Sequence, residues 1–129
     1  MSRNYEVIKA HYAGSDAKDL AAMMAPITAT TAWTEMTGFP YAGTYVGPDA
    51  VIAGVFKRIG EDWDGYTFKL EHLVDGDSTI VGIGTYSGTF RKTGKAMSAR
   101  VAHVWTMRDG KAVSFEQFTD TKLVAAAMS

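Results

Sequence analysis

The sequence predicts an α+β fold in which N-terminal helices pack on a strongly curved antiparallel sheet, so that the two together form a cone. Two observations lead to this prediction. Helical patterns are concentrated in the first half of the chain, whereas the second half consists of long strand-like segments separated by short turn sequences. Gly82, Gly84 and Gly88 lie within one of those segments, where glycine permits the bends that a curved sheet requires.

The N-terminal residues predict two helices in succession. Apolar and aromatic side chains recur at helical spacing over residues 4–13, and Gly14 is a plausible end for this first helix. Ser15 or Asp16 can then cap a second helix, which is rich in strong helix formers and continues to Met24.

A strand and a third helix follow. Residues 28–36 are rich in β-branched threonine and include the aromatic Trp33, which is typical of a strand. Three glycines and two prolines over residues 37–48 indicate a loop with room for a short hairpin. Pro48 is well placed to begin the third helix, because proline is favoured at the first helical position.

Three or four long strands are expected in the second half of the chain. They span residues 66–74, 79–91, 96–108 and 111–119. The intervening sequences DGDS, KTGK and RDGK are short turn signals, which imply antiparallel hairpins. Residues 121–128 can form a final short helix, with the side chain of Asp120 as its cap.

Composition narrows the functional classes. The chain has 129 residues, 47% hydrophobic and 21% charged, which predicts one globular domain over residues 1–129. The net charge is −1 and no basic stripe is present, so a nucleic-acid partner is not expected. No cysteine is present, which excludes disulfides and thiolate metal sites. No signal peptide or membrane-spanning run is found, so we expect a cytoplasmic protein without a membrane partner.

His103 raises the main functional question, because it lies in an otherwise apolar and aromatic strand. It could be a hydrogen-bonded core residue, a proton-transfer group facing a pocket, or a metal ligand. The three histidines, His11, His72 and His103, show no metal-ligand spacing, so no metal site is predicted.

Strand alternation gives His103 its expected neighbours. It shares a strand face with Trp105, and on the next strand Gln117 shares a face with Val113 and Phe115. A strict two-residue Asp-Gly turn would put the two sets on opposite sides of the sheet, whereas a bulge after the turn would bring them together. The sequence leaves the pairing of His103 with Gln117 open.

Four segments, in this order and spacing, carry a resemblance over nearly the whole chain: AGSDAKDLAAMM, WTEMTG, YAGTYVGPDAV and HVWTMRDGKAVSFEQFTDT. They resemble the nuclear transport factor 2-like superfamily, in particular its SnoaL-like polyketide cyclase and ketosteroid isomerase branches. The resemblance implies the cone fold described above. It also implies that members dimerise through the outer face of the sheet, so a homodimer is expected.

The resemblance also implies catalytic positions. The catalytic aspartate of the isomerases corresponds to Glu35, which precedes a glycine turn, and the histidine of the cyclases corresponds to His103. Where the cyclases carry a catalytic aspartate, this chain has Gln117, which can hydrogen-bond but cannot transfer a proton at neutral pH. The oxyanion-binding tyrosine of the isomerases has no exact match, although Tyr5 and Tyr12 lie on the same helical face, offset from it.

Two functions fit these residues. The first is a cofactor-free isomerase or cyclase, with Glu35 as base, His103 as oxyanion donor and Gln117 as an orienting partner. The second is a non-catalytic module that binds a small ligand or serves for dimerisation. In both, flat walls suited to a small apolar ligand come from aromatic side chains. These are Tyr12, Trp33, Trp105 and Phe115.

Overall fold

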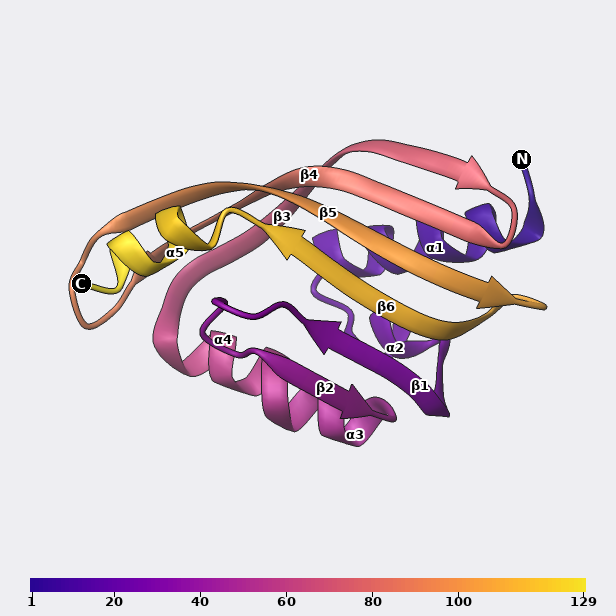
Figure 1. Cartoon of the computed structure of the whole chain (residues 1–129), viewed down its shortest axis with the longest axis horizontal. Coiled ribbons are helices and arrows are strands. Elements are labelled where there is room, and N and C mark those ends of the chain that lie inside the picture. The colour runs from indigo at the N-terminus through magenta and orange to yellow at the C-terminus, as the bar shows by residue number, and fades with distance from the viewer.

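The computed structural model describes all of residues 1–129 and has the α+β cone architecture that the sequence predicts (Figure 1). The helices are α1 (Arg3–Asp16), α2 (Leu20–Met24), α3 (Pro48–Val51), α4 (Lys57–Asp62) and α5 (Thr121–Ala127), with a π-helical turn η1 (Ile52–Phe56) joining α3 to α4. The strands are β1 (Ile27–Glu35), β2 (Gly43–Val46), β3 (Trp63–Gly76), β4 (Thr79–Phe90), β5 (Ala96–Arg108) and β6 (Lys111–Thr119).

All six strands belong to one sheet with the order β2-β1-β6-β5-β4-β3. Neighbouring strands are antiparallel except β1 and β6, which are parallel. The sequence predicts the hairpins of the second half but not this parallel pair, because its two strands are far apart in the chain. In Figure 1 the sheet curves over α1, α2 and the α3–α4 helix.

The first two helices differ from the sequence prediction at their junction. Helix α1 continues through Gly14, and the cap of α2 is Asp19, whose side chain accepts a hydrogen bond from the backbone N–H of Ala22 at 3.1 Å. Ser15 and Asp16 therefore lie in α1 and do not cap α2. Gly14 serves close packing: a Cβ there would lie 2.7 Å from the Cβ of Ala22.

The third helix begins at Pro48 as predicted, and its middle turn is π-helical. Single π-turns within α-helices occur frequently at functional sites. This one carries Val55 and Phe56, which line the cavity described below. Gly54 in the same turn lets the helix approach β2, because a Cβ there would overlap the ring of Tyr45.

The second half of the chain follows the predicted hairpins closely. The strand expected at residues 66–74 is longer at both ends, since β3 begins at Trp63 and ends at Gly76. The turn between β5 and β6 has Asp109 and Gly110 at positive φ, as in a two-residue type I′ hairpin. The cap predicted for the last helix is confirmed, because the side chain of Asp120 accepts a hydrogen bond from the N–H of Leu123 at 3.2 Å.

Two apolar clusters form the core. One joins α1 to the concave face of the sheet and includes Ile8, Trp105 and Phe115, all at most 1% exposed. The other lies towards the C-terminal helix and includes Tyr41 and Val124. None of the helices is long and apolar enough to cross a membrane.

Candidate functional site

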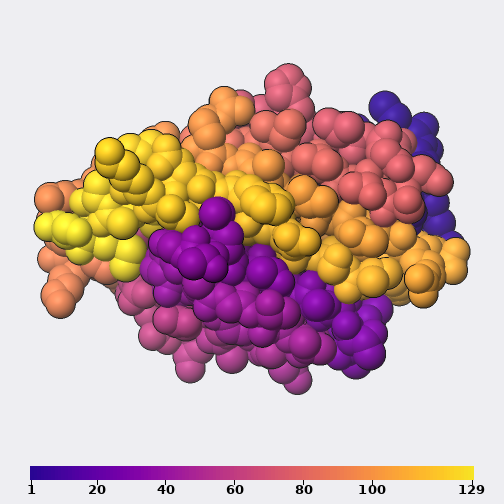
Figure 2. Space-filling model, viewed as in Figure 1, coloured from indigo at the N-terminus to yellow at the C-terminus, as the bar shows by residue number.

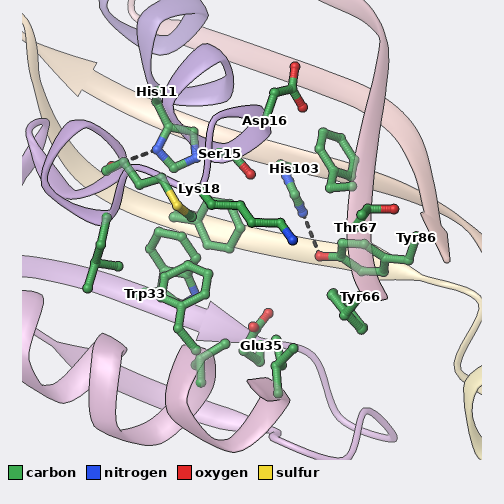
Figure 3. A pocket seen from close by; sticks show the side chains of 17 residues that line it. His11, Ser15, Asp16, Lys18, Trp33, Glu35, Tyr66, Thr67, Tyr86 and His103 are labelled. Atoms are coloured by element: carbon green, nitrogen blue, oxygen red, sulfur yellow. Dashed lines mark hydrogen bonds between the residues drawn. The ribbon is translucent and has the colours of Figure 1, made fainter. Parts of the chain in front are cut away.

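A cavity of about 410 Å³ lies between the concave face of the sheet and the helices. Its walls are mainly aromatic and aliphatic, and Figure 3 shows the side chains that line it. Trp33 and Phe115 stack on each other, with ring centroids 3.7 Å apart, and both line the cavity together with Phe56, whose ring packs edge-to-face with Trp33. Asp16 at the end of α1 and Lys18 in the turn between α1 and α2 are exposed lining residues, so the cavity opens to solvent there.

The register between β5 and β6 brings His103 directly opposite Gln117. The hairpin turn has two residues, and a bulge between the Thr106 and Met107 pairings moves the later residues of β6 to the other face. Val113, which alternation placed beside Phe115, is consequently exposed, and its neighbour Ala112 is buried instead. The expectation for Val113 was therefore wrong, while the open question of the His103–Gln117 pair is answered by the bulge.

Both ring nitrogens of His103 are engaged within the protein. Nδ1 lies 2.8 Å from the hydroxyl of Tyr12 and Nε2 lies 2.7 Å from the hydroxyl of Tyr86. Trp105 donates its indole N–H to the Tyr12 hydroxyl at 3.0 Å, and Gln117 donates an amide N–H to the Tyr86 hydroxyl at 3.0 Å. Burial lowers the pKa of His103 to about 3, so the imidazole is neutral.

Counting protons in this network identifies a free donor. A neutral imidazole has one N–H, so one of the two tyrosines donates to His103 and the other accepts from it, keeping its own proton. If Tyr12 kept a spare proton, that proton would be buried outside the cavity without a partner, which costs about 1–3 kcal/mol. Tyr86 lines the cavity. The favoured arrangement therefore has the proton of His103 on Nε2 and leaves the hydroxyl proton of Tyr86 without a partner in the protein, at the wall of the cavity.

Glu35 is the only carboxyl group buried in this cavity. It ends β1 and is 4% exposed, and its Oε2 has no hydrogen-bond partner. Burial raises the pKa of Glu35 to about 8, and the nearby indole of Trp33 offsets part of the rise. At neutral pH the group is thus mostly protonated but easily ionised, which suits proton transfer.

Two further buried polar atoms in the same cavity lack partners. They are the indole Nε1 of Trp33 and the hydroxyl of Tyr66. Both are donors, and buried donors without partners are uncommon in folded proteins. Burial and then the charge of Glu35 raise the pKa of Tyr66 well above its usual value, so this hydroxyl keeps its proton.

The predicted site residues fall into two groups. Glu35, His103, Trp33 and Phe115 line the cavity. Gln117, Tyr12 and Trp105 do not line it; they lie behind its wall, where all three belong to the hydrogen-bond network of His103.

His11, Tyr66 and Tyr86 are among the polar lining residues that were not predicted. Tyr86 could have been found by alternation, because it shares a strand face with Gly82 and Gly84. A Cβ at Gly82 would overlap the hydroxyl of Tyr12, so these glycines make room for rings beside the cavity. No group of three or more His, Cys, Asp or Glu side chains is placed to hold a metal ion.

The buried titratable groups predict a stability maximum near pH 6.5. Glu35 keeps its proton up to about pH 8 when folded but loses it near pH 4.5 when unfolded, so the free energy of unfolding falls as pH rises through this window. His11 and His103 act oppositely below their usual pKa of 6.5, since burial lowers them to about 4 and 3. Between pH 6.5 and 8 only the effect of Glu35 remains, and it lowers the free energy of unfolding by about 2 kcal/mol.

Urea denaturation at successive pH values tests this prediction. In Glu35→Gln, which has no proton to lose, the free energy of unfolding should no longer fall as pH increases above 6.5. It should still rise as pH increases towards 6.5, because His11 and His103 are unchanged. An equal decline in the variant would show that Glu35 is not the group responsible.

Comparison with known proteins identifies similar sequences and similar folds. A family model of the SnoaL-like domain matches residues 8–115. The solved structure of an NTF2-like protein from Burkholderia thailandensis is 56% identical, with all of this chain and 99% of the other covered and a TM-score of 0.97. The structure of TerC co-crystallised with polyporic acid is 25% identical, with 98% of each chain covered and a TM-score of 0.88.

A curated relative shows a shorter match. The Patulin biosynthesis cluster protein F of Penicillium expansum is 37% identical over 60 residues, which are 45% of this chain. The match spans only 30% of that protein's length.

Proposed function

Because this chain belongs to the SnoaL-like domain family of the NTF2-like superfamily, we propose that it is a cofactor-free enzyme that moves a proton beside a carbonyl group. Family membership alone does not specify an activity. The observation that carries the proposal is the Glu35 carboxyl, buried and with one oxygen unpartnered in the same cavity as unused hydroxyl donors.

The proposed step uses Glu35 as the base. Its carboxylate takes a proton from the carbon next to the ligand's carbonyl, and the electrons of the broken C–H bond move onto the carbonyl oxygen to form an enolate. The hydroxyls of Tyr86 and Tyr66 donate hydrogen bonds to that oxygen. Return of the proton to another carbon gives an isomer. Attack of the enolate carbon on a second carbonyl of the same molecule gives a ring, and the proton held by Glu35 then passes to the oxygen of that second carbonyl.

His103 and Gln117 act as positioning residues in this proposal. Both hold the Tyr86 hydroxyl, at 2.7 and 3.0 Å, and neither has to change its protonation state. This differs from the expectation that His103 itself donates to the oxyanion. Its two nitrogens already have partners, so the donor role passes to Tyr86.

The ligand in this proposal is small, flat and mostly apolar. The stacked rings of Trp33 and Phe115 favour a planar ring, and the volume of about 410 Å³ suits a compound of a few rings. The relatives support a small organic ligand, since one is a protein of a patulin biosynthesis cluster and another was co-crystallised with polyporic acid.

Exchange of α-protons in deuterated water tests the activity. The protein is incubated with cyclic enones, β-diketones and aromatic ketones, binding is measured by calorimetry, and loss of the α-proton signal is followed by NMR. We expect exchange above the buffer rate for at least one compound that binds. Binding without exchange by every bound compound would instead identify a non-catalytic ligand-binding module.

We also propose that the chain forms a homodimer through the outer face of the sheet. Figure 2 views this face, where β4, β5 and β6 lie at the surface and α5 is seen only at the left end. It carries two exposed apolar side chains, Val113 at 42% and Phe118 at 47%, beside the half-buried Ala102 and Val104. Burying such side chains against a second copy would remove apolar area from water.

A charge on this face should prevent the association. In Phe118→Glu two carboxylates would be brought together at the interface, so we expect the dimer to dissociate at least tenfold more readily in sedimentation analysis. Val74→Glu, an exposed apolar residue of β3 at the far edge of the sheet, is the control and should leave the dimer intact. A wild-type chain that sediments as a monomer would refute the proposal.

A further inference from the structure

His11 is a polar residue of the cavity that the proposed reaction does not use. It lies on α1, is 4% exposed, and its ring packs edge-on against Tyr12 and Trp105 at centroid distances of 4.8 and 4.7 Å. Its Nδ1 lies 2.7 Å from the backbone carbonyl oxygen of Met23 in α2. The ring is therefore held by its T-shaped packing against these two rings and by one hydrogen bond.

That hydrogen bond determines which nitrogen carries the proton. A carbonyl oxygen can only accept, so Nδ1 must donate and Nε2 is left with a free lone pair. Burial lowers the pKa of His11 to about 4, which keeps the ring neutral at physiological pH. In Figure 3 the second ring nitrogen is turned away from the bonded carbonyl, and it has no hydrogen-bond partner in the protein. His11 thus presents a fixed acceptor to the cavity.

The other end of the cavity presents hydrogen-bond donors instead of an acceptor. Tyr66, Tyr86 and Trp33 all present N–H or O–H groups, and in Figure 3 the two tyrosines lie near Glu35, far from His11. A bound molecule would satisfy both ends if it carried a hydrogen-bond donor towards His11 and an acceptor towards the tyrosines. The lining between them is mainly apolar and aromatic, which suits a flat ring as the connection, and Lys18 extends over it from the α1–α2 turn (Figure 3).

We propose that His11 is a specificity-determining residue that selects ring ketones carrying a phenolic or enolic hydroxyl, through a hydrogen bond from that hydroxyl to Nε2. The position of the ketone at the tyrosines rests on the proposed function.

Matched ligand pairs provide the test. The probes are para-hydroxyacetophenone against acetophenone, and acetylnaphthalene with and without a hydroxyl on the distal ring, so that two lengths are sampled. Calorimetry should show that the hydroxyl compound of at least one pair binds about five- to tenfold more tightly, the effect of one net hydrogen bond. Its methyl ether should lose this advantage.

Two variants distinguish the hydrogen bond to Nε2 of His11 from the packing of its ring against the ligand. His11→Asn retains an N–H for the Met23 carbonyl but has no acceptor at the position of Nε2, because its amide oxygen lies nearer the backbone, whereas His11→Phe retains the bulk of the ring. Both should abolish the preference for the hydroxyl while binding the unsubstituted ketone within about threefold of wild type. Thermal unfolding confirms that each variant is folded, and either one alone suffices for the comparison.

The inference is overturned if wild type binds both members of each pair equally, if none of the four compounds binds, or if the preference persists in a folded variant. Failure of the proposed function has a different signature, since α-proton exchange is measured by NMR on the same complexes. A hydroxyl preference that depends on His11 without any exchange would support the assignment of His11 and refute the enzyme.

Discussion

Replacement of Glu35 by glutamine is expected to reduce α-proton exchange by about 10²- to 10⁴-fold, the usual contribution of a positioned general base. Glutamine has nearly the same shape and can still hydrogen-bond, but it cannot accept the proton. Because Oε2 of Glu35 has no partner in the protein, the substitution breaks no internal hydrogen bond of that atom. Ligand affinity should therefore stay within a few-fold of wild type.

Glu61→Gln is the matched control for this variant. Glu61 is an exposed carboxylate at the end of α4 and does not line the cavity, so the same change of charge should leave exchange unaltered. NMR exchange rates at saturating ligand separate loss of the base from loss of binding. Exchange within threefold of wild type in folded Glu35→Gln would eliminate Glu35 as the base.

Removal of the Tyr86 hydroxyl should have the second-largest effect. We expect Tyr86→Phe to slow exchange by about 10²- to 10³-fold, the range observed when one oxyanion donor is deleted. The variant also leaves His103 Nε2 and the amide of Gln117 without their partner, so the free energy of unfolding should fall by about 1–3 kcal/mol.

Tyr12→Phe distinguishes the expected loss of exchange rate from the expected loss of stability. It removes the other hydroxyl bonded to His103 and leaves the indole N–H of Trp105 unpartnered, so its loss of stability should be similar. Because Tyr12 does not line the cavity, its exchange rate should fall less than tenfold. Equal losses of rate in the two variants would show that the network acts only through stability, and that Tyr86 does not contact the enolate.

The sequence predicts the fold well where local rules decide it. Alternation along β5 places His103 and Trp105 on the buried face, and both are at most 6% exposed. The Asp-Gly dipeptide at residues 109–110 forms the expected hairpin turn. These features depend on neighbours in the chain, so periodicity and turn chemistry suffice to find them.

Features that depend on distant partners were harder to predict. The bulge in β6 exposes Val113 because the sheet adjusts its register along the paired strands, and nothing at that position in the sequence signals it. Gly14 resembles a helix end until the close approach of Ala22 is known. Tyr86 is one of several tyrosines, and it becomes distinctive only when His103 and Gln117 meet at its hydroxyl.

The dependence of exchange on pH tests the central claim, that Glu35 is the base, most directly. Glu35 must be ionised to accept a proton. The second-order rate constant for exchange, measured at low ligand concentration, should therefore rise about tenfold per pH unit below pH 8 and level off above it, matching the pKa of about 8. Tyr66 and Tyr86 keep their protons over this range, because burial raises the pKa of each well above its usual value. A profile with this inflection in wild type, absent in Glu35→Gln, is the predicted result. A rate independent of pH, or an inflection that survives the substitution, would contradict it.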